Sequence, residues 1–205
     1  MDLNECFQDL IKDTYNAEKQ LLKALPKMSK SAMNPQLKEA FERHRLETEE
    51  HCRRLEQVAQ MCGFRPTGVV CKGMQGLIDE CNEHMGEMKP GPLMDAMMAL
   101  LAQKNEHYEI AAYGTAVAWA KVLGKNDCID LLTQTLNDEE RTDDLLTEMA
   151  EGTLNQEAMN TPMEEKKSSG GSRSKSSSSS SSSKSGPRSK ASSSKSGMAK
   201  KVSVR

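Results

Sequence analysis

Glutamate and histidine side chains interrupt four long stretches of the sequence that are otherwise apolar at helical spacing. Carboxylate oxygens and imidazole nitrogens together suit iron or manganese. An unpaired carboxylate in a protein core costs on the order of several kcal/mol, and no Lys or Arg lies on these apolar stripes at the same level to offset it. A bound metal ion is the simplest counter-charge. The candidate metal ligands are Glu18, His44, Glu47, Glu106, Glu109 and Glu139, and His51 is a further candidate.

Four helices are needed to position these side chains. Apolar residues recur at helical spacing over approximately residues 3–30, 35–62, 94–122 and 128–149. The polar interruptions fall near the midpoint of each segment. Midpoints of antiparallel helices of similar length lie at the same height, because every helix rises about 1.5 Å per residue. The sequence therefore predicts that the polar groups share one layer of a helical bundle.

The lengths of the connections predict how the helices are joined. The first and last links are only a few residues long, which makes each flanking pair of helices an antiparallel hairpin. The middle link has about 30 residues and contains a short amphipathic segment between Met74 and Met85. Two hairpins joined by one long crossover define the ferritin-like connectivity. We expect an all-α, ferritin-like antiparallel four-helix bundle over residues 1–155, with a short extra helix in the crossover.

An internal repeat relates the two predicted hairpins. A shift of 91 residues places Glu18 on Glu109, and it places the segment from Thr48 to His51 on the segment from Glu139 to Thr142. Ferritin-like dinuclear sites take one Glu from each of two helices and a Glu-x-x-His motif from each of the other two. Each half of this chain keeps one member of such a motif.

The sequence resembles a known family in the segments DTYNAEKQLLKALPKMSKSAMNPQLKEAFERHRLETEEH, MQGLIDE, EHYEIAAYGTAVAWAKVLG and LNDEERTDDLLTEMA. They are similar to the YciE/YciF-type ferritin-like stress proteins of bacteria, over roughly residues 3–151. The resemblance implies a dimeric four-helix bundle, a dinuclear iron or manganese site and a stress-linked role. The departures from the ferritin-like motif are that the second helix has the reversed order His44-x-x-Glu47 and that the fourth helix has no histidine. They predict an incomplete or unusual site.

Several of these residues also have plain structural interpretations. Glu47 and Glu106 lie at the edges of their apolar stripes, where a side chain can turn towards solvent. A single histidine on an apolar stripe is often a hydrogen-bonded core residue, and this applies to His44 and His51. The tyrosines could relay electrons near a metal site, but tyrosines that close a bundle core are commoner, and we interpret them as packing residues.

Charge divides the chain into two parts. From Lys166 onward there are 11 of the 28 basic residues and no acidic residue. The remainder carries 17 basic and 30 acidic residues, so its net charge is near −13. The terminal part is rich in Ser, Lys and Arg and has almost nothing apolar to bury, so we predict that residues 156–205 form a disordered basic tail. Such a tail favours nonspecific contact with nucleic acid or another polyanion. The candidate contacts are Arg173, Lys175, Lys184, Arg188, Lys190, Lys195, Lys200 and Lys201.

The remaining composition favours a helical cytoplasmic protein. Only 3% of the residues are aromatic, while Met alone supplies 14 residues, which suits helix packing. The six cysteines form no CxxC pair, so we expect free thiols in a reducing compartment. The N-terminus is acidic and polar, and no stretch reaches 18 apolar residues, so neither a secretory signal nor a membrane span is predicted.

Three functions compete at this stage. The first is a di-iron or di-manganese protein that handles oxygen, peroxide or ferrous iron under stress; if it turns over, it is an oxidoreductase. The second is a non-enzymatic bundle whose polar layer specifies helix register and homodimer pairing. The third is a binding protein whose basic tail places an acidic domain on DNA.

Overall fold

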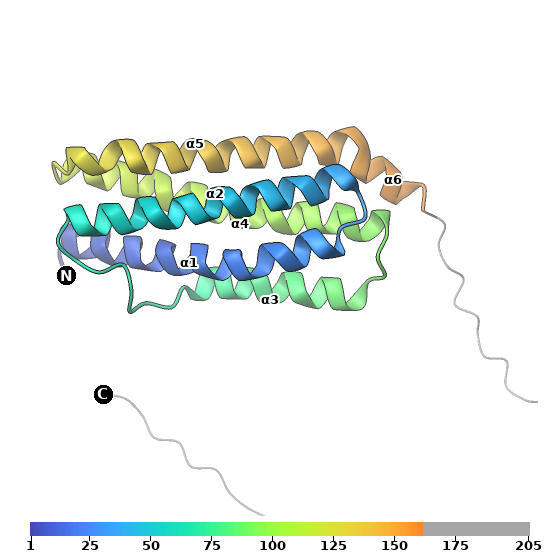
Figure 1. Ribbon diagram of the computed structural model, residues 1–205, viewed down its shortest axis with the longest axis horizontal. Coiled ribbons are helices and arrows are strands. Elements are labelled where there is room, and N and C mark those ends of the chain that lie inside the picture. The colour runs from blue at the N-terminus through green and yellow to red at the C-terminus, as the bar shows by residue number, and fades with distance from the viewer. Residues whose placement is uncertain (162–205) are drawn as a thin grey trace, which may run out of the picture. The chain divides into compact units, whose positions relative to one another are not determined.

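The protein is described here by a computed structural model, which covers residues 1–161 as a helical bundle with no strand among these residues (Figure 1). The predicted all-α bundle fold is confirmed. The predicted polyanion contacts between Arg173 and Lys201 lie outside the described residues. The helices are α1 (Leu3–Ser31), α2 (Pro35–Met61), α3 (Lys72–Glu87), α4 (Pro92–Val122), α5 (Asn126–Met149), the π-helix η1 (Ala150–Leu154) and α6 (Asn155–Met159). Helical structure thus continues to Met159, beyond the predicted boundary at residue 155.

Local capping explains where α1 and α2 begin. Asp2 and Glu5 form a reciprocal capping box at the start of α1. The Asn34 side chain accepts hydrogen bonds from the first backbone amides of α2, and Pro35 occupies the first helical turn. The Met33 and Asn34 amides donate to the Asp95 carboxylate on α4 at 2.8 Å and 2.7 Å, which ties the first hairpin to the second.

The long helices pack as two antiparallel hairpins, α1 with α2 and α4 with α5 (Figure 1). Helix α3, in the crossover, lies against α1 and α4. None of the helices in residues 1–161 is both long and apolar enough to span a membrane.

The apolar core is divided into two clusters along the bundle. One contains Phe7, Ile11, Leu55 and Leu132. The other contains Leu21, Phe41, Leu101 and Leu146. On all four long helices, buried polar residues lie where these two clusters meet; the buried Ser29 and Asp95 are exceptions and lie among residues of the second cluster. The predicted polar layer near the middle of the helices is therefore present, enclosed by apolar packing at both ends.

Candidate metal centre

The polar layer draws a buried side chain from every long helix. Helix α1 supplies Glu18, α2 supplies both imidazoles, α4 supplies two carboxylates and α5 supplies one. None of these six side chains belongs to a residue more than 3% exposed. They are Glu18, His44, His51, Glu106, Glu109 and Glu139.

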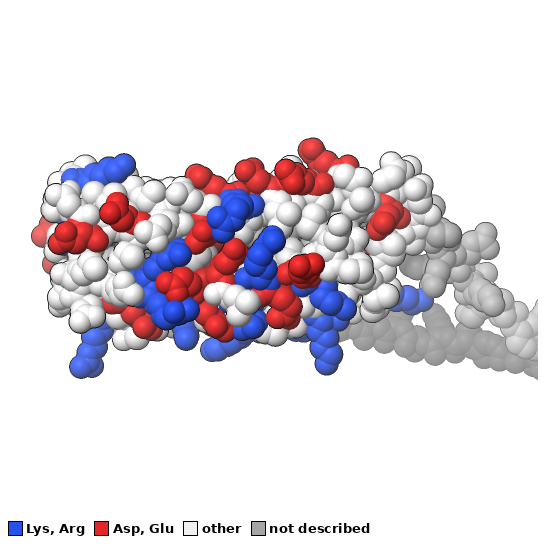
Figure 2. All heavy atoms as spheres, turned by 45° about the horizontal axis from the view of Figure 1, so that its top comes forward, with Lys and Arg blue, Asp and Glu red and all other residues white. Residues whose placement is uncertain are grey.

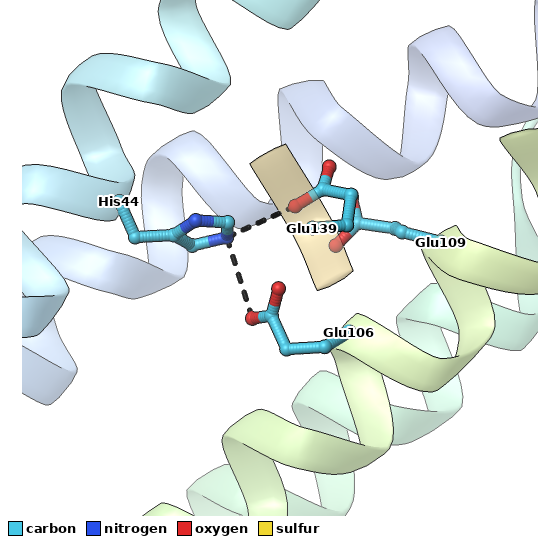
Figure 3. Close-up of side chains that lie close together, drawn as sticks. All are labelled: His44, Glu106, Glu109 and Glu139. Carbon is cyan, nitrogen blue, oxygen red and sulfur yellow. Dashed lines mark ion pairs between the residues drawn. The ribbon is translucent and has the colours of Figure 1, made fainter. Parts of the chain in front are cut away.

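The first group of potential ligands surrounds the His44 imidazole (Figure 3). It contains His44, Glu106, Glu109 and Glu139, and one ligand atom from each lies within 4.8 Å of all the others. His44 Nε2 is 3.4 Å from Glu106 Oε1 and 4.0 Å from Glu139 Oε2. Since the four side chains come from α2, α4 and α5, the group exists only when the two hairpins are packed together.

The second group surrounds the His51 imidazole and contains Glu18, His51 and Glu139, again with ligand atoms within 4.8 Å of one another. His51 Nδ1 lies 3.0 Å from Glu139 Oε1 and 3.5 Å from Glu18 Oε1. Glu139 therefore belongs to both groups, and its two carboxylate oxygens face different imidazoles. Each group therefore has one oxygen of Glu139 among its potential ligand atoms.

Many polar atoms of the layer make no hydrogen bond. Ten buried side-chain nitrogen and oxygen atoms in the described chain have no hydrogen-bond partner; nine of them belong to the six residues of the layer, and the tenth is the Asn105 amide oxygen. Both oxygens of Glu109 and of Glu139 are among them. Even the 3.0 Å approach between His51 and Glu139 lacks the alignment of a hydrogen bond. Buried polar atoms normally make hydrogen bonds, so this concentration of atoms without one marks a set of groups that could hold a metal ion.

The electrostatics of the layer favour proton binding when no metal is present. Burial lowers the pKa of the His44 imidazole, but Glu106, Glu47 and Glu139 outweigh burial and raise it to about 9. Burial likewise opposes the charged form of His51, and the Glu18 and Glu139 carboxylates raise its pKa to about 11. These imidazoles bind protons that a metal ion would have to displace.

Two carboxyl groups of the layer are also shifted towards their protonated forms. Burial raises the pKa of Glu106 well above its ordinary value, although the His44 imidazole acts in the opposite direction. Burial and the neighbouring Glu18 and Glu139 raise the pKa of Glu109 in the same way. Close carboxylates in a low-dielectric layer share protons unless another cation replaces them.

Glu47 lies at the edge of the centre and belongs to neither group. Its side chain is 21% exposed, its Oε2 is 3.8 Å from His44 Nδ1, and its Oε1 is 3.1 Å from an Arg141 nitrogen. Glu106, the other residue at a stripe edge, is buried and faces His44. The structure therefore separates two glutamates that the sequence placed in equivalent positions.

Tyr113 is a residue of the site that we interpreted as packing only. Its hydroxyl donates a hydrogen bond to Glu18 Oε1, and the residue is 1% exposed. Burial, then Glu18, raises the pKa of Tyr113 well above its ordinary value, so it stays a neutral donor. The sequence signal was available, because Tyr113 follows Glu109 by four residues and so shares its helix face.

The sequence did not predict a charged network outside the layer, formed by Asp138, Arg54 and Arg141. Asp138 Oδ2 lies 3.4 Å from His51 Nε2 and 2.7 Å from an Arg54 nitrogen, while Arg141 is 2.9 Å from Asp138 Oδ1. Burial raises the pKa of Asp138, but the two arginines outweigh it and the net shift is downward. An ionised carboxylate at the outer nitrogen of a histidine fixes the ring and its tautomer. Figure 2 shows acidic and basic side chains interspersed over one face of the bundle.

Comparison with known proteins places this helical chain in a family. The chain matches the family described as "Domain of unknown function (DUF892)" over residues 2–159, and it belongs to that family. It is 38% identical over 159 residues to protein YciF of Escherichia coli K12, covering 77% of this chain and 96% of that protein. The resemblance predicted from the sequence is confirmed.

Two solved structures extend the similarity to the fold. The crystal structure of the E. coli stress protein YciF has a TM-score of 0.73 and 38% sequence identity, covering 76% of this chain and 98% of that chain. YcfI of Rhodopseudomonas palustris, described as a candidate structural protein, has a TM-score of 0.70 and 39% identity, covering 72% of this chain and 94% of that chain.

Proposed function

We propose that the polar layer binds two iron or manganese ions, and that the protein uses this dinuclear centre to handle iron, oxygen or peroxide during stress. The observation that carries the proposal is the set of unpaired, buried ligand atoms from Glu18, His44, His51, Glu106, Glu109 and Glu139. Residues Glu18, His51 and Glu139 would hold one ion. Residues His44, Glu106, Glu109 and Glu139 would hold the other, so that Glu139 is shared.

The charges of the layer fit two divalent ions. Its four carboxylates carry four negative charges when ionised, and its two imidazoles are neutral when they act as ligands. Two divalent cations would therefore leave the layer without net charge. Mixed carboxylate and imidazole ligands suit iron and manganese, and the burial of all six residues keeps bulk water away from the centre.

Residues around the ligands have supporting roles. Bound iron or manganese would supply redox chemistry towards oxygen, peroxide or ferrous iron. Tyr113 holds the Glu18 carboxylate through its hydroxyl, and Asp138 holds the outer nitrogen of His51. The stress role rests on similarity to the E. coli stress protein YciF. Turnover at the centre would make the protein an oxidoreductase of the di-iron or di-manganese type.

A second function is favoured by the proton-binding groups of the layer. Two imidazoles with raised pKa values facing four carboxylates can offset much of the negative charge without a metal. The layer would then specify helix register and homodimer pairing, as buried polar groups do in some helical proteins. The description of YcfI as a candidate structural protein agrees with this alternative. Homodimer formation and contact of the basic tail with polyanions remain further proposals.

Metal analysis separates the two functions. Protein purified without chelator should contain about two iron or manganese ions per chain, or should take up two ferrous or manganous ions on titration. The matched control is the Glu140→Gln variant, which changes an exposed glutamate beside Glu139. Absence of bound metal together with absence of uptake would refute the metal centre and favour the structural layer.

A further inference from the structure

Two cysteine thiols meet at one end of the bundle, away from the polar layer. Cys62 follows the last residue of α2, and Cys128 lies in the first turn of α5. Their sulfur atoms are 3.5 Å apart, although the residues are 66 positions apart in sequence. In Figure 1 the end of α2 and the start of α5 lie at the same end of the bundle. The contact therefore joins the first hairpin to the second.

The pair is accessible to a small solute. A surface pocket of about 330 Å³ is lined by both cysteines and by the turn between α4 and α5, including Lys125. Cys62 is partly exposed, whereas Cys128 is 2% exposed. One thiol of the pair can therefore meet a reagent from solvent, while the other is held behind it.

We propose that Cys62 and Cys128 form a reversible disulfide when the protein meets hydrogen peroxide. The Cys62 sulfur, as its thiolate, attacks one peroxide oxygen; the oxygen–oxygen bond breaks, and the products are a sulfenic acid and hydroxide, which takes a proton to become water. The Cys128 sulfur then attacks the Cys62 sulfur. The new sulfur–sulfur bond forms as the second water leaves with the Cys128 proton. Two thiols are oxidised and one peroxide is reduced to two waters.

The local backbone allows the required movement. A disulfide bond is about 2.05 Å long, so the sulfurs must approach by about 1.5 Å from their separation of 3.5 Å. Cys62 lies outside the last turn of α2, next to Gly63 with a φ of 76°, and Cys128 lies close to the turn at Gly124 with a φ of 68°. Helix ends of this kind adjust more easily than helix interiors.

The other thiols lack this arrangement. Among residues 1–161 no other two cysteine sulfurs are in contact. Cys71 contacts the Tyr108 hydroxyl at 2.9 Å instead, and Cys52 and Cys81 are buried within helices. The oxidation should therefore be selective for a single pair out of the six cysteines.

The test is peroxide treatment of the full chain. Free thiols are blocked with N-ethylmaleimide, and the protein is digested with trypsin and chymotrypsin, because cleavage after Phe64 separates Cys62 from Cys71. We expect a loss of about 2 Da, consumption of two of the six thiols, and a peptide pair that joins Cys62 to Cys128. Diamide, a thiol oxidant that needs no metal, should give the same bridge, and dithiothreitol should reverse it.

Variants and stability complete the test. Cys62→Ser and Cys128→Ser should abolish the bridge, and Cys128→Ser should leave a sulfenic acid at Cys62 that dimedone traps, whereas the control Cys52→Ser should retain the bridge. Because the bond closes a long loop between the hairpins, the oxidised parent should melt roughly 5–15 °C higher than the reduced one. Six unreacted thiols, scrambled or intermolecular pairing, or direct oxidation of Cys62 to sulfinic acid in the parent would overturn the proposal.

Discussion

Glu139 is the residue whose replacement tests the proposed metal centre most directly. Its Oε1 lies 3.0 Å from His51 Nδ1 and its Oε2 lies 4.0 Å from His44 Nε2, so each oxygen serves one group of ligands. In Glu139→Gln the amide keeps one oxygen and carries no charge. At least one of the two ligand groups, around His44 or around His51, then loses the oxygen of residue 139. The other group keeps only a neutral amide oxygen. We expect the affinity for ferrous or manganous ion to fall by at least 100-fold, which corresponds to about 2.7 kcal/mol.

The stability of the protein offers an independent measure of the same loss. A ligand that binds only the folded state stabilises that state. At saturating ligand, a 100-fold rise in the dissociation constant lowers this stabilisation by about 2.7 kcal/mol. For a domain of this size, about 1 kcal/mol shifts the Tm by roughly 2–4 °C. The metal-dependent rise in Tm should therefore be smaller in Glu139→Gln by roughly 5–10 °C.

The metal-free variant should behave differently. Removing the Glu139 charge leaves His44 and His51 each with one fewer carboxylate partner, but it also removes the repulsion that Glu139 exerts on Glu106 and Glu109. The Tm in chelator should therefore be unchanged or slightly higher. The measurements are calorimetric titration with manganous ion and melting with and without chelator, with Glu140→Gln as control. Parent-like affinity in Glu139→Gln, or an equal loss in the control, would refute the assignment of Glu139 as a shared ligand.

Three further predictions concern pH, the residues that support the ligands, and the C-terminal tail. Because folding raises the pKa of His44 to about 9 and that of His51 to about 11, proton binding stabilises the metal-free fold fully at and below pH 6.5, and this stabilisation is lost as the pH rises towards those values. The Tm of the metal-free protein should therefore fall from pH 6.5 to 9, while its metal affinity rises. Melting and metal titration across that pH range check both expectations. Tyr113→Phe and Asp138→Asn should each weaken metal binding by roughly 10- to 100-fold in the same titration, with little change in helicity by circular dichroism. Truncation after Thr161 should leave helicity and Tm almost unchanged, because the sequence beyond it has almost no apolar side chains; a large fall in Tm would contradict this.

The helices and the polar layer were predictable because both depend on patterns within single segments. Apolar spacing gave helix limits close to those observed, with α1 predicted over residues 3–30 and found at Leu3–Ser31. The layer followed from the position of the interruptions along each helix, since all helices rise equally per residue. The helix limits and the polar layer both depend only on where a residue lies along the length of its own helix.

The rotation of each helix about its own axis was less predictable. Glu47 and Glu106 both lie at the edge of an apolar stripe, yet Glu47 pairs with Arg141 near the surface and Glu106 is buried against His44. Which edge turns inward depends on the neighbouring helices that cover it. The same reason applies to the contacts of Asp138 with His51 and Arg54, which cross from α5 to α2 and leave no pattern in either segment.

The unusual motif order has a structural explanation in the way the two hairpins share the centre. The 91-residue repeat places His51 on Thr142 and His44 on Thr135, so both buried imidazoles come from α2 and none comes from α5. The His44 ring instead crosses towards α5, where its Nδ1 lies 3.5 Å from the Thr142 hydroxyl. Three of the four carboxylates in the polar layer come from the second hairpin. The first hairpin thus supplies the imidazoles and the second supplies most of the charge, so neither hairpin could form this centre alone.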